Sequence, residues 1–154
     1  MLASMALFFT IIAYDNVVDY PTNYAFVQHV LSMDTTFQSP HLMGRAITSP
    51  TIHTIFYWVI IATEMITALG LWLSVFLLAK NLFHYEHFRK YKDYAMLSLF
   101  IGFTLYFVGF LIIAGEWFAM WQSSEWNAQK PAGLFASLLI LMMLLINAAE
   151  QEST

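Results

Sequence analysis

Glu64 is the residue of this sequence that most clearly points to chemistry. It is the single charged residue between His53 and Leu78, in the stretch HTIFYWVIIATEMITALGLWLSVFLL. An ionised carboxylate in hydrocarbon costs on the order of a few kcal/mol or more, so it must face the interior of a helical bundle, find a partner or stay protonated. Two roles are open: a group that handles a proton or anchors a ligand, and a structural hydrogen bond between two helices or subunits.

The neighbours of Glu64 follow from helical spacing. Steps of three and four residues place a set of side chains on its face of the helix: His53, Tyr57, Ile60, Thr67 and Leu71. Thr63 and Thr67 lie near enough along the same helix to donate hydrogen bonds to the carboxylate.

The histidines are a second set of potential ligands. His29, His41 and His53 are expected on one side of the membrane, where Asp34 or Glu116 would complete a metal site. We favour the simpler interpretation that these are interfacial polar residues. His84 and His87 share a helical spacing but lie in a basic loop, where solvated side chains are expected. We therefore predict no metal and no catalytic group, and the sequence favours a protein that is not an enzyme.

Two aromatic patterns are typical of membrane proteins. The segment Gly115–Asn127, GEWFAMWQSSEWN, contains three tryptophans that we expect to anchor it at the interface, although they could also line a binding face. The second pattern is a helical stripe of phenylalanines, which we expect to serve packing or to contact lipid or a partner helix: Phe100, Phe103, Phe107 and Phe110.

The composition places the whole chain in a membrane. Its 154 residues are 60% hydrophobic and only 10% charged, whereas soluble domains carry about 25% charged residues. A core of this size cannot hide so many apolar side chains from water, so lipid must solvate many of them. The net charge of −4 and the lack of a basic patch argue against nucleic-acid binding, and the lack of cysteine excludes disulfides and thiolate sites. We expect a single membrane domain, 1–154.

Four predicted transmembrane helices would position Glu64. A bilayer core of ~30 Å needs ~20 apolar residues, and segments 52–79, 94–115 and 132–148 suit that length. The first apolar segment is shorter. It could be a signal-peptide core, a span that continues to Val18, or a span whose first residues are missing. We favour a transmembrane helix over 1–18 and leave open whether its start is complete. A signal peptide fits less well, because no Lys or Arg precedes the segment and no clear cleavage site follows it.

The loops predict the orientation and a short extra helix. Segment 80–93 holds four of the six Lys and Arg residues, so the positive-inside rule places it, and both termini, in the cytoplasm. Segments 19–51 and 116–131 are then outer loops. Asn23 to Met33 has apolar residues at helical spacing with Asn23 as N-cap, which predicts a short helix on the membrane surface or the bundle top. The expected fold is an all-α, antiparallel four-transmembrane-helix bundle with this interfacial helix.

The outer motifs resemble a known family. NYAFVQHVLSMDTTF, RAITSP, the span that bears Glu64, and GEWFAMWQSSEWN are similar to the bacterial predicted small integral membrane protein family, a domain of unknown function. In many members a Trp precedes the Arg, where Gly44 stands here, and more residues come before the first span. The resemblance implies four spans and carries no activity. It also implies that certain residues are motif positions: Asn23, His29, Asp34, Arg45, Glu64, Glu116, Trp117 and Trp121.

Arg45 needs a physical role in this arrangement. Its guanidinium has five donors that suit carboxylates. We hypothesise that Arg45 pairs with Asp34 or Glu116 and so holds the two motif loops together over the outer end of the bundle.

Three functions fit these features. We favour an accessory or structural subunit of a larger bacterial membrane complex, with a respiratory complex as one candidate, because the chain is small and carries no catalytic motif. The first alternative is a small proton-linked transporter or channel that uses Glu64, against which the lack of Gly- or Pro-broken spans counts. The second is a membrane enzyme that binds a cofactor or metal. The expected partners are the lipid bilayer of the inner membrane, with bound lipid, and other subunits.

Overall fold

The computed structural model describes residues 1–151, without the side chains of 85–87 and 149–151, and this part of the chain is helical with no strand. Its elements are α1 Leu2–Val18, α2 Tyr20–Ser32, η1 Met43–Arg45, α3 Pro50–Lys80, α4 Tyr85–Thr104, η2 Leu105–Trp117, η3 Met120–Gln122 and α5 Gln129–Gln151. The side chain of His87 and most of the tail expected in the cytoplasm lie outside the described residues.

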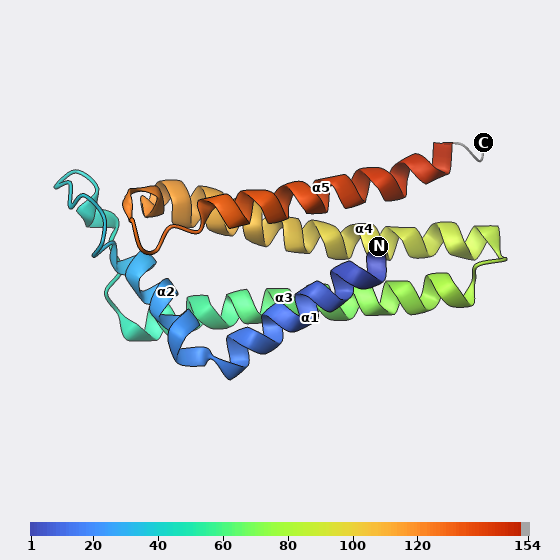
Figure 1. Ribbon diagram of the computed structural model, residues 1–154, viewed down its shortest axis with the longest axis horizontal. Helices are drawn as coiled ribbons and strands as arrows, with labels where there is room; N and C mark the ends of the chain where they lie inside the picture. The colour runs from blue at the N-terminus through green and yellow to red at the C-terminus, as the bar shows by residue number, and fades with distance from the viewer. Residues whose placement is uncertain (152–154) are drawn as a thin grey trace.

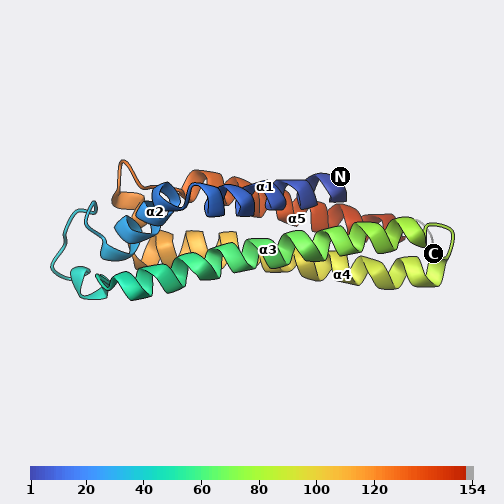
Figure 2. The same ribbon diagram turned by 90° about the horizontal axis from the view of Figure 1, so that it is seen from below.

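The long helices alternate in direction (Figure 1). α3 and α4 lie side by side along their length (Figures 1 and 2). α1 packs against α3, and α5 packs against α4 and η2. The loops between α2 and α3 and between η2 and α5 meet at one end of the molecule, whereas the turn between α3 and α4 lies at the other. Helices α3, α4 with η2, and α5 are each long and apolar enough to cross a membrane.

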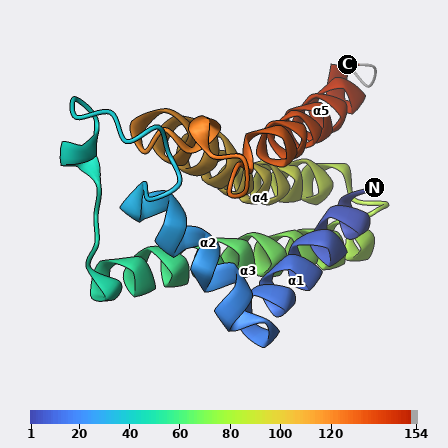
Figure 3. The same ribbon diagram turned by 60° about the vertical axis from the view of Figure 1, so that its left-hand side comes forward.

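The first predicted span, 1–18, corresponds to the single helix α1. α1 has 17 residues and reaches spanning length only together with α2, from which it is bent by 90° (Figure 3). The chain therefore has three candidate spans, or four if this pair counts as one. The N-cap of α2 is Asp19 rather than the expected Asn23, because Pro21 stands in the first turn, where its missing N–H and fixed φ are tolerated.

One face of α2 is buried against the rest of the molecule. Its buried residues Val27, Val30 and Leu31 share a hydrophobic cluster with Tyr57 and Ile61 of α3, and it packs against α3, which it crosses in Figure 3. The spacing of apolar residues from Asn23 to Met33 therefore predicted the helix itself. Its position against α3 depends on contacts with the rest of the chain, which the spacing does not specify.

The helix of the third predicted span begins before residue 94, where the span was expected to start, and changes from an α-helix to a π-helix along its length. α4 starts at Tyr85, inside the segment 80–93 expected to be a loop, because the Lys and Arg residues there are good helix formers whose charges can remain in water. From Leu105 the chain continues as a π-helix, η2, and the N–H of Phe118 bonds the carbonyl of Ile113. A π-helix is uncommon beyond a single turn and is frequent at functional sites.

The wider turn of η2 redistributes its side chains. Bonds from residue i to i+5 bring residues four to five apart onto one face. Phe103 and Phe107 remain stacked, with ring centroids 5.1 Å apart. Phe110 instead faces inward, where its ring lies 6.1 Å from that of Phe26. The predicted phenylalanine stripe therefore ends at Phe107.

Small residues allow close helix contacts around the centre of the bundle. Ala6 and Phe9 of α1 pack on Ala68 and Leu71 of α3 in one hydrophobic cluster. A Cβ added to Gly102 of α4 would lie 2.6 Å from the ring of Phe9 and 3.1 Å from Thr67. Gly102 therefore sets how closely α4 approaches both α1 and α3.

Candidate functional site

Glu64 is buried near the middle of α3. Its relative exposure is 2%, and the residues of its helix face are buried with it, as the spacing predicts. The one difference is at Ile60, which is only half-buried while Ile61 is fully buried. The buried face of α3 comprises His53, Tyr57, Ile61, Glu64, Thr67, Ala68, Leu71 and Ser74.

The hydrogen-bond donor to Glu64 comes from another helix. Nδ2 of Asn16 in α1 lies 2.7 Å from Oε2 of Glu64. The expectation that Thr63 and Thr67 would donate to the carboxylate is wrong, because each donates to the carbonyl four residues earlier on its own helix. This back-bonding is the usual local alternative for Thr within a helix.

The side chain of Tyr57 binds the main chain of Asn16. Its hydroxyl donates to the carbonyl oxygen of Asn16 at 2.7 Å. Because α1 ends two residues later at Val18, that carbonyl belongs to the last turn, whose acceptors have no intrahelical partner. Asn16 is therefore held by its side chain to Glu64 and by its main chain to Tyr57, next to the α1–α2 break.

A cavity of about 350 Å³ adjoins the carboxylate. Its polar lining groups are the side chains of Asn16, Asn23, Tyr57, Glu64 and Tyr106. Among the described residues no donor reaches the second carboxyl oxygen of Glu64, Oε1. The rest of the lining is apolar and largely aromatic: Phe8, Ile12, Phe26, Val27, Ile60, Phe110, Ala128 and Phe135.

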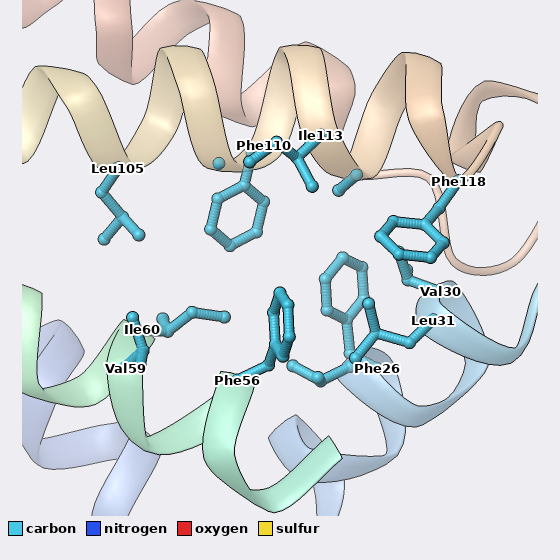
Figure 4. A pocket seen from close by; sticks show the side chains of 13 residues that line it. Phe26, Val30, Leu31, Phe56, Val59, Ile60, Leu105, Phe110, Ile113 and Phe118 are labelled. Atoms are coloured by element: carbon cyan, nitrogen blue, oxygen red, sulfur yellow. The ribbon is translucent and has the colours of Figure 1, made fainter. Parts of the chain in front are cut away.

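A second, fully apolar cavity of about 170 Å³ lies between α2, α3 and η2. Figure 4 shows side chains of the three elements pointing toward one another across it. Phe26, Val27, Ile60 and Phe110 line both cavities, so the two spaces are neighbours. The π-helical face of η2 supplies one wall: Leu105, Gly109, Phe110, Ile113 and Ala114.

The motif residues His29 of α2 and Asp34, just after α2, form a separate polar cluster. Nδ1 of His29 lies 2.8 Å from Oδ2 of Asp34, and the two make an ion pair if the imidazole is protonated. The His29 ring also stacks on Trp126 at 4.6 Å. Asn23 is placed differently: it lines the larger cavity while its amide donates to the carbonyl of Asp19 at 3.2 Å.

Arg45 has a different partner from the one expected. Its guanidinium donates to the carbonyl oxygen of Trp117 at 3.2 Å and lies over the Trp117 ring at 4.6 Å. It pairs with neither Asp34 nor Glu116 in the described structure, and the exposed carboxylate of Glu116 instead accepts a bond of 3.3 Å from Gln129. A planar guanidinium can stack on an indole and donate to a carbonyl at once, so Arg45 needs no carboxylate here.

Other bonds join the loop between α2 and α3 to the loop between η2 and α5. Thr35 donates to Ser123 at 2.9 Å, and the side chain of Gln122 accepts the N–H of Phe37 at 3.0 Å. The ring of Phe37 packs edge-on against Trp121 at 5.9 Å. Segments far apart in sequence thus cover the same end of the helices together.

The histidines do not gather into a metal site. The described residues contain no group of three or more His, Asp and Glu that could hold a metal ion. Nε2 of His53 donates to the carbonyl of Ile47 at 2.7 Å, while Nδ1 is buried with no partner among the described residues. The outer site from His29, His41 and His53, which the sequence left open, is therefore not formed.

Two residues of the cavity were missed by reasoning from the sequence. Asn16 follows Asp15 at the end of a short apolar segment and looks like an interfacial residue. A usable signal is that it continues the buried face Ala6, Phe9 and Ala13 by one step of three. Tyr106 lies in an apolar run without any charge, and a usable signal is that it follows the buried Leu99 and Gly102 of α4 at helical spacing.

Comparison with known proteins places the chain in a family. The chain belongs to the family described as "Predicted small integral membrane protein (DUF2165)", whose model matches residues 1–149. It is thus an integral membrane protein, as the composition predicts. No curated protein and no solved structure matches it.

Proposed function

We propose that the protein is an accessory subunit of a larger membrane complex, with a respiratory complex as one candidate. The observation that carries this proposal is the apolar surface that the single chain leaves uncovered. In the most apolar parts of α4 with η2 and of α5, only 22% of residues are buried within the chain, against 33% in α3. Membrane helices associate by packing against such surfaces, and the remaining area contacts lipid.

The uncovered surface has three faces on which a partner can be sought. Leu73 represents α3, Phe107 represents η2 and Leu141 represents α5, with exposures of 53%, 40% and 54%. A photoreactive amino acid at each position, in the chain expressed at its native level, reports what lies against that face. We expect one larger membrane protein to be linked reproducibly from a single face. Links only to lipid, or to a second copy from every face, would contradict the accessory role.

The proposed location is the bacterial inner membrane, with both termini and the α3–α4 turn in the cytoplasm. The support is the concentration of Lys and Arg around that turn. Because the chain has no cysteine, single substitutions report on topology without background. Leu82→Cys should be protected from an impermeant maleimide in intact spheroplasts, whereas Ser124→Cys should react. The reverse pattern would invert the orientation.

A second function, a small proton-linked transporter or channel built on Glu64, is favoured by the break between α1 and α2. Broken helices beside a buried ionisable group are typical of membrane transporters. Here the break follows the hydrogen-bonded Asn16, and the cavity at Glu64 lies beside it. Counted as one span, the bent pair of α1 and α2 would be a broken helix of this kind.

Proteoliposomes containing the purified chain test this second function. With a pH-sensitive dye inside the vesicles, the wild type should dissipate an imposed proton gradient faster than empty liposomes, and Glu64→Gln should not. Glu125→Gln changes an exposed acid in the outer loop and should behave as the wild type. Equal rates for the wild type and Glu64→Gln would remove this function without affecting the accessory role.

A further inference from the structure

We infer that the two neighbouring cavities bind a lipophilic organic cation, an alkylammonium whose charged head meets Glu64 and whose chain enters the apolar cavity. The inference does not depend on the accessory role, because it concerns the isolated chain. We call the larger cavity, at Glu64, the head chamber, and the smaller, apolar cavity the arm. Three features support the inference: the charge of the head chamber, the aromatic side chains that line it, and the exposed rim of the arm.

The head chamber contains one acid and no counter-charge. Glu64 is 2% exposed, and its one described hydrogen-bond donor is the neutral amide of Asn16. None of the six Lys and Arg residues lines either cavity. A charge at this depth needs a partner of opposite sign. A cationic ligand would supply that partner and would reach the free oxygen Oε1.

The wall of the chamber suits an organic cation better than a metal ion. Six aromatic side chains line it: Phe8, Phe26, Tyr57, Tyr106, Phe110 and Phe135. Ring faces attract ammonium groups, and quaternary ammonium ions are recognised in aromatic cages. A divalent metal ion would need several oxygen or nitrogen ligands, and the described residues contain no group of three or more His, Asp and Glu that could hold one. The volume of about 350 Å³ is in the usual range for small-molecule sites.

The apolar cavity adjoins the chamber, with which it shares four lining residues, and it also reaches side chains at the surface. Phe56, Val59 and Ile113 line it and are also 38%, 57% and 39% exposed. Part of the rim of the cavity therefore consists of exposed side chains of α3 and η2. An alkyl chain entering from the bilayer would fill this arm, while the trimethylammonium group reaches Glu64 past the shared residues Phe26 and Phe110.

Equilibrium dialysis of decyltrimethylammonium against the full chain in lipid nanodiscs, with empty nanodiscs subtracted, tests the head. We expect saturable binding that Glu64→Gln weakens at least tenfold, because Gln keeps the size and the acceptor for Asn16 but loses the charge. Glu125→Gln, an exposed acid, should bind as the wild type does. Equal affinity of Glu64→Gln, or equal binding of the neutral amphiphile 1-decanol, would overturn the proposal and indicate a groove for lipid chains.

Larger side chains placed in the apolar cavity test whether it holds the alkyl chain of the ligand. Gly109 lines the apolar cavity, and a Cβ there would meet only Leu105, at an ordinary 3.6 Å. Gly109→Leu should therefore fold and should reduce the ratio of decyl- to butyl-trimethylammonium affinity at least tenfold. Val59→Trp, at the exposed rim, gives a second blocking variant if the first does not fold. An unchanged ratio in both variants would show that the chain lies elsewhere and would overturn the two-cavity assignment.

Discussion

The amide of Asn16 and the carboxylate of Glu64 lie 2.7 Å apart although they are 48 positions apart in the chain. This bond connects the last turn of α1 to the middle of α3, and both residues line the larger cavity. Its energy can be measured separately from the hydrophobic packing between the same two helices, and it bears on stability as well as on the proposed ligand site.

A double-mutant cycle isolates the Asn16–Glu64 bond. Asn16→Leu should lower the free energy of unfolding by about 1–3 kcal/mol, because it leaves a buried carboxylate without a donor. In a Glu64→Leu background the same change should cost less, with a coupling energy of about 1–2 kcal/mol. Reversible unfolding in mixed micelles, followed by circular dichroism, gives these values. As a control, Thr63→Val should not couple to Glu64, since its hydroxyl bonds Val59; additive effects of Asn16 and Glu64 would contradict the bond.

Tyr57→Phe tests how the end of α1 is held. The change removes the hydroxyl that donates to the Asn16 carbonyl and keeps the ring in its aromatic cluster, so we expect a loss of about 1 kcal/mol in unfolding free energy. Tyr20→Phe is a matched control, because the Tyr20 ring packs on Tyr57 at 4.8 Å while no hydrogen bond of its hydroxyl is described. Equal effects of the two changes would argue against a specific role for the Tyr57 hydroxyl.

Gly102 and Gly133 should respond to alanine in opposite directions. At Gly102 the added Cβ would lie 2.6 Å from Phe9, and overpacking of this kind costs about 1–3 kcal/mol. At Gly133, in α5, nothing lies within 4 Å of the added Cβ, and alanine should stabilise the helix by about 0.5–1 kcal/mol. The same unfolding assay compares both variants, and a stabilising Gly102→Ala would show that α1 and α4 are not in close contact.

Arg45→Ala should loosen the outer loops without unfolding the helices. Losing the contacts with Trp117 removes about 0.5–1 kcal/mol at a half-exposed site, which corresponds to a twofold to fivefold increase in amide exchange. The readout is the N–H of Ile47, which bonds the Leu31 carbonyl at 2.8 Å. Lys130→Ala, an exposed cation, should leave that exchange unchanged. Unaltered protection of the Ile47 N–H in Arg45→Ala would show that Arg45 does not stabilise the contact between the two loops.

The sequence by itself determined that the chain is a helical membrane protein and that its acid is hidden. These properties depend on apolar length and on spacing along one helix, both of which are local. The buried face of α3 shows this, since His53, Tyr57, Thr67 and Leu71 are all interior as their spacing with Glu64 predicts.

Only the tertiary structure decided what meets that acid. The choice of Asn16 over Thr63 depends on how α1 crosses α3, and the partner of Arg45 depends on how two distant loops meet. The bend between α1 and α2 and the π-helical turn of η2 shape the two cavities. Such features arise from contacts between segments far apart in the chain, and no local pattern of apolar and polar residues specifies them.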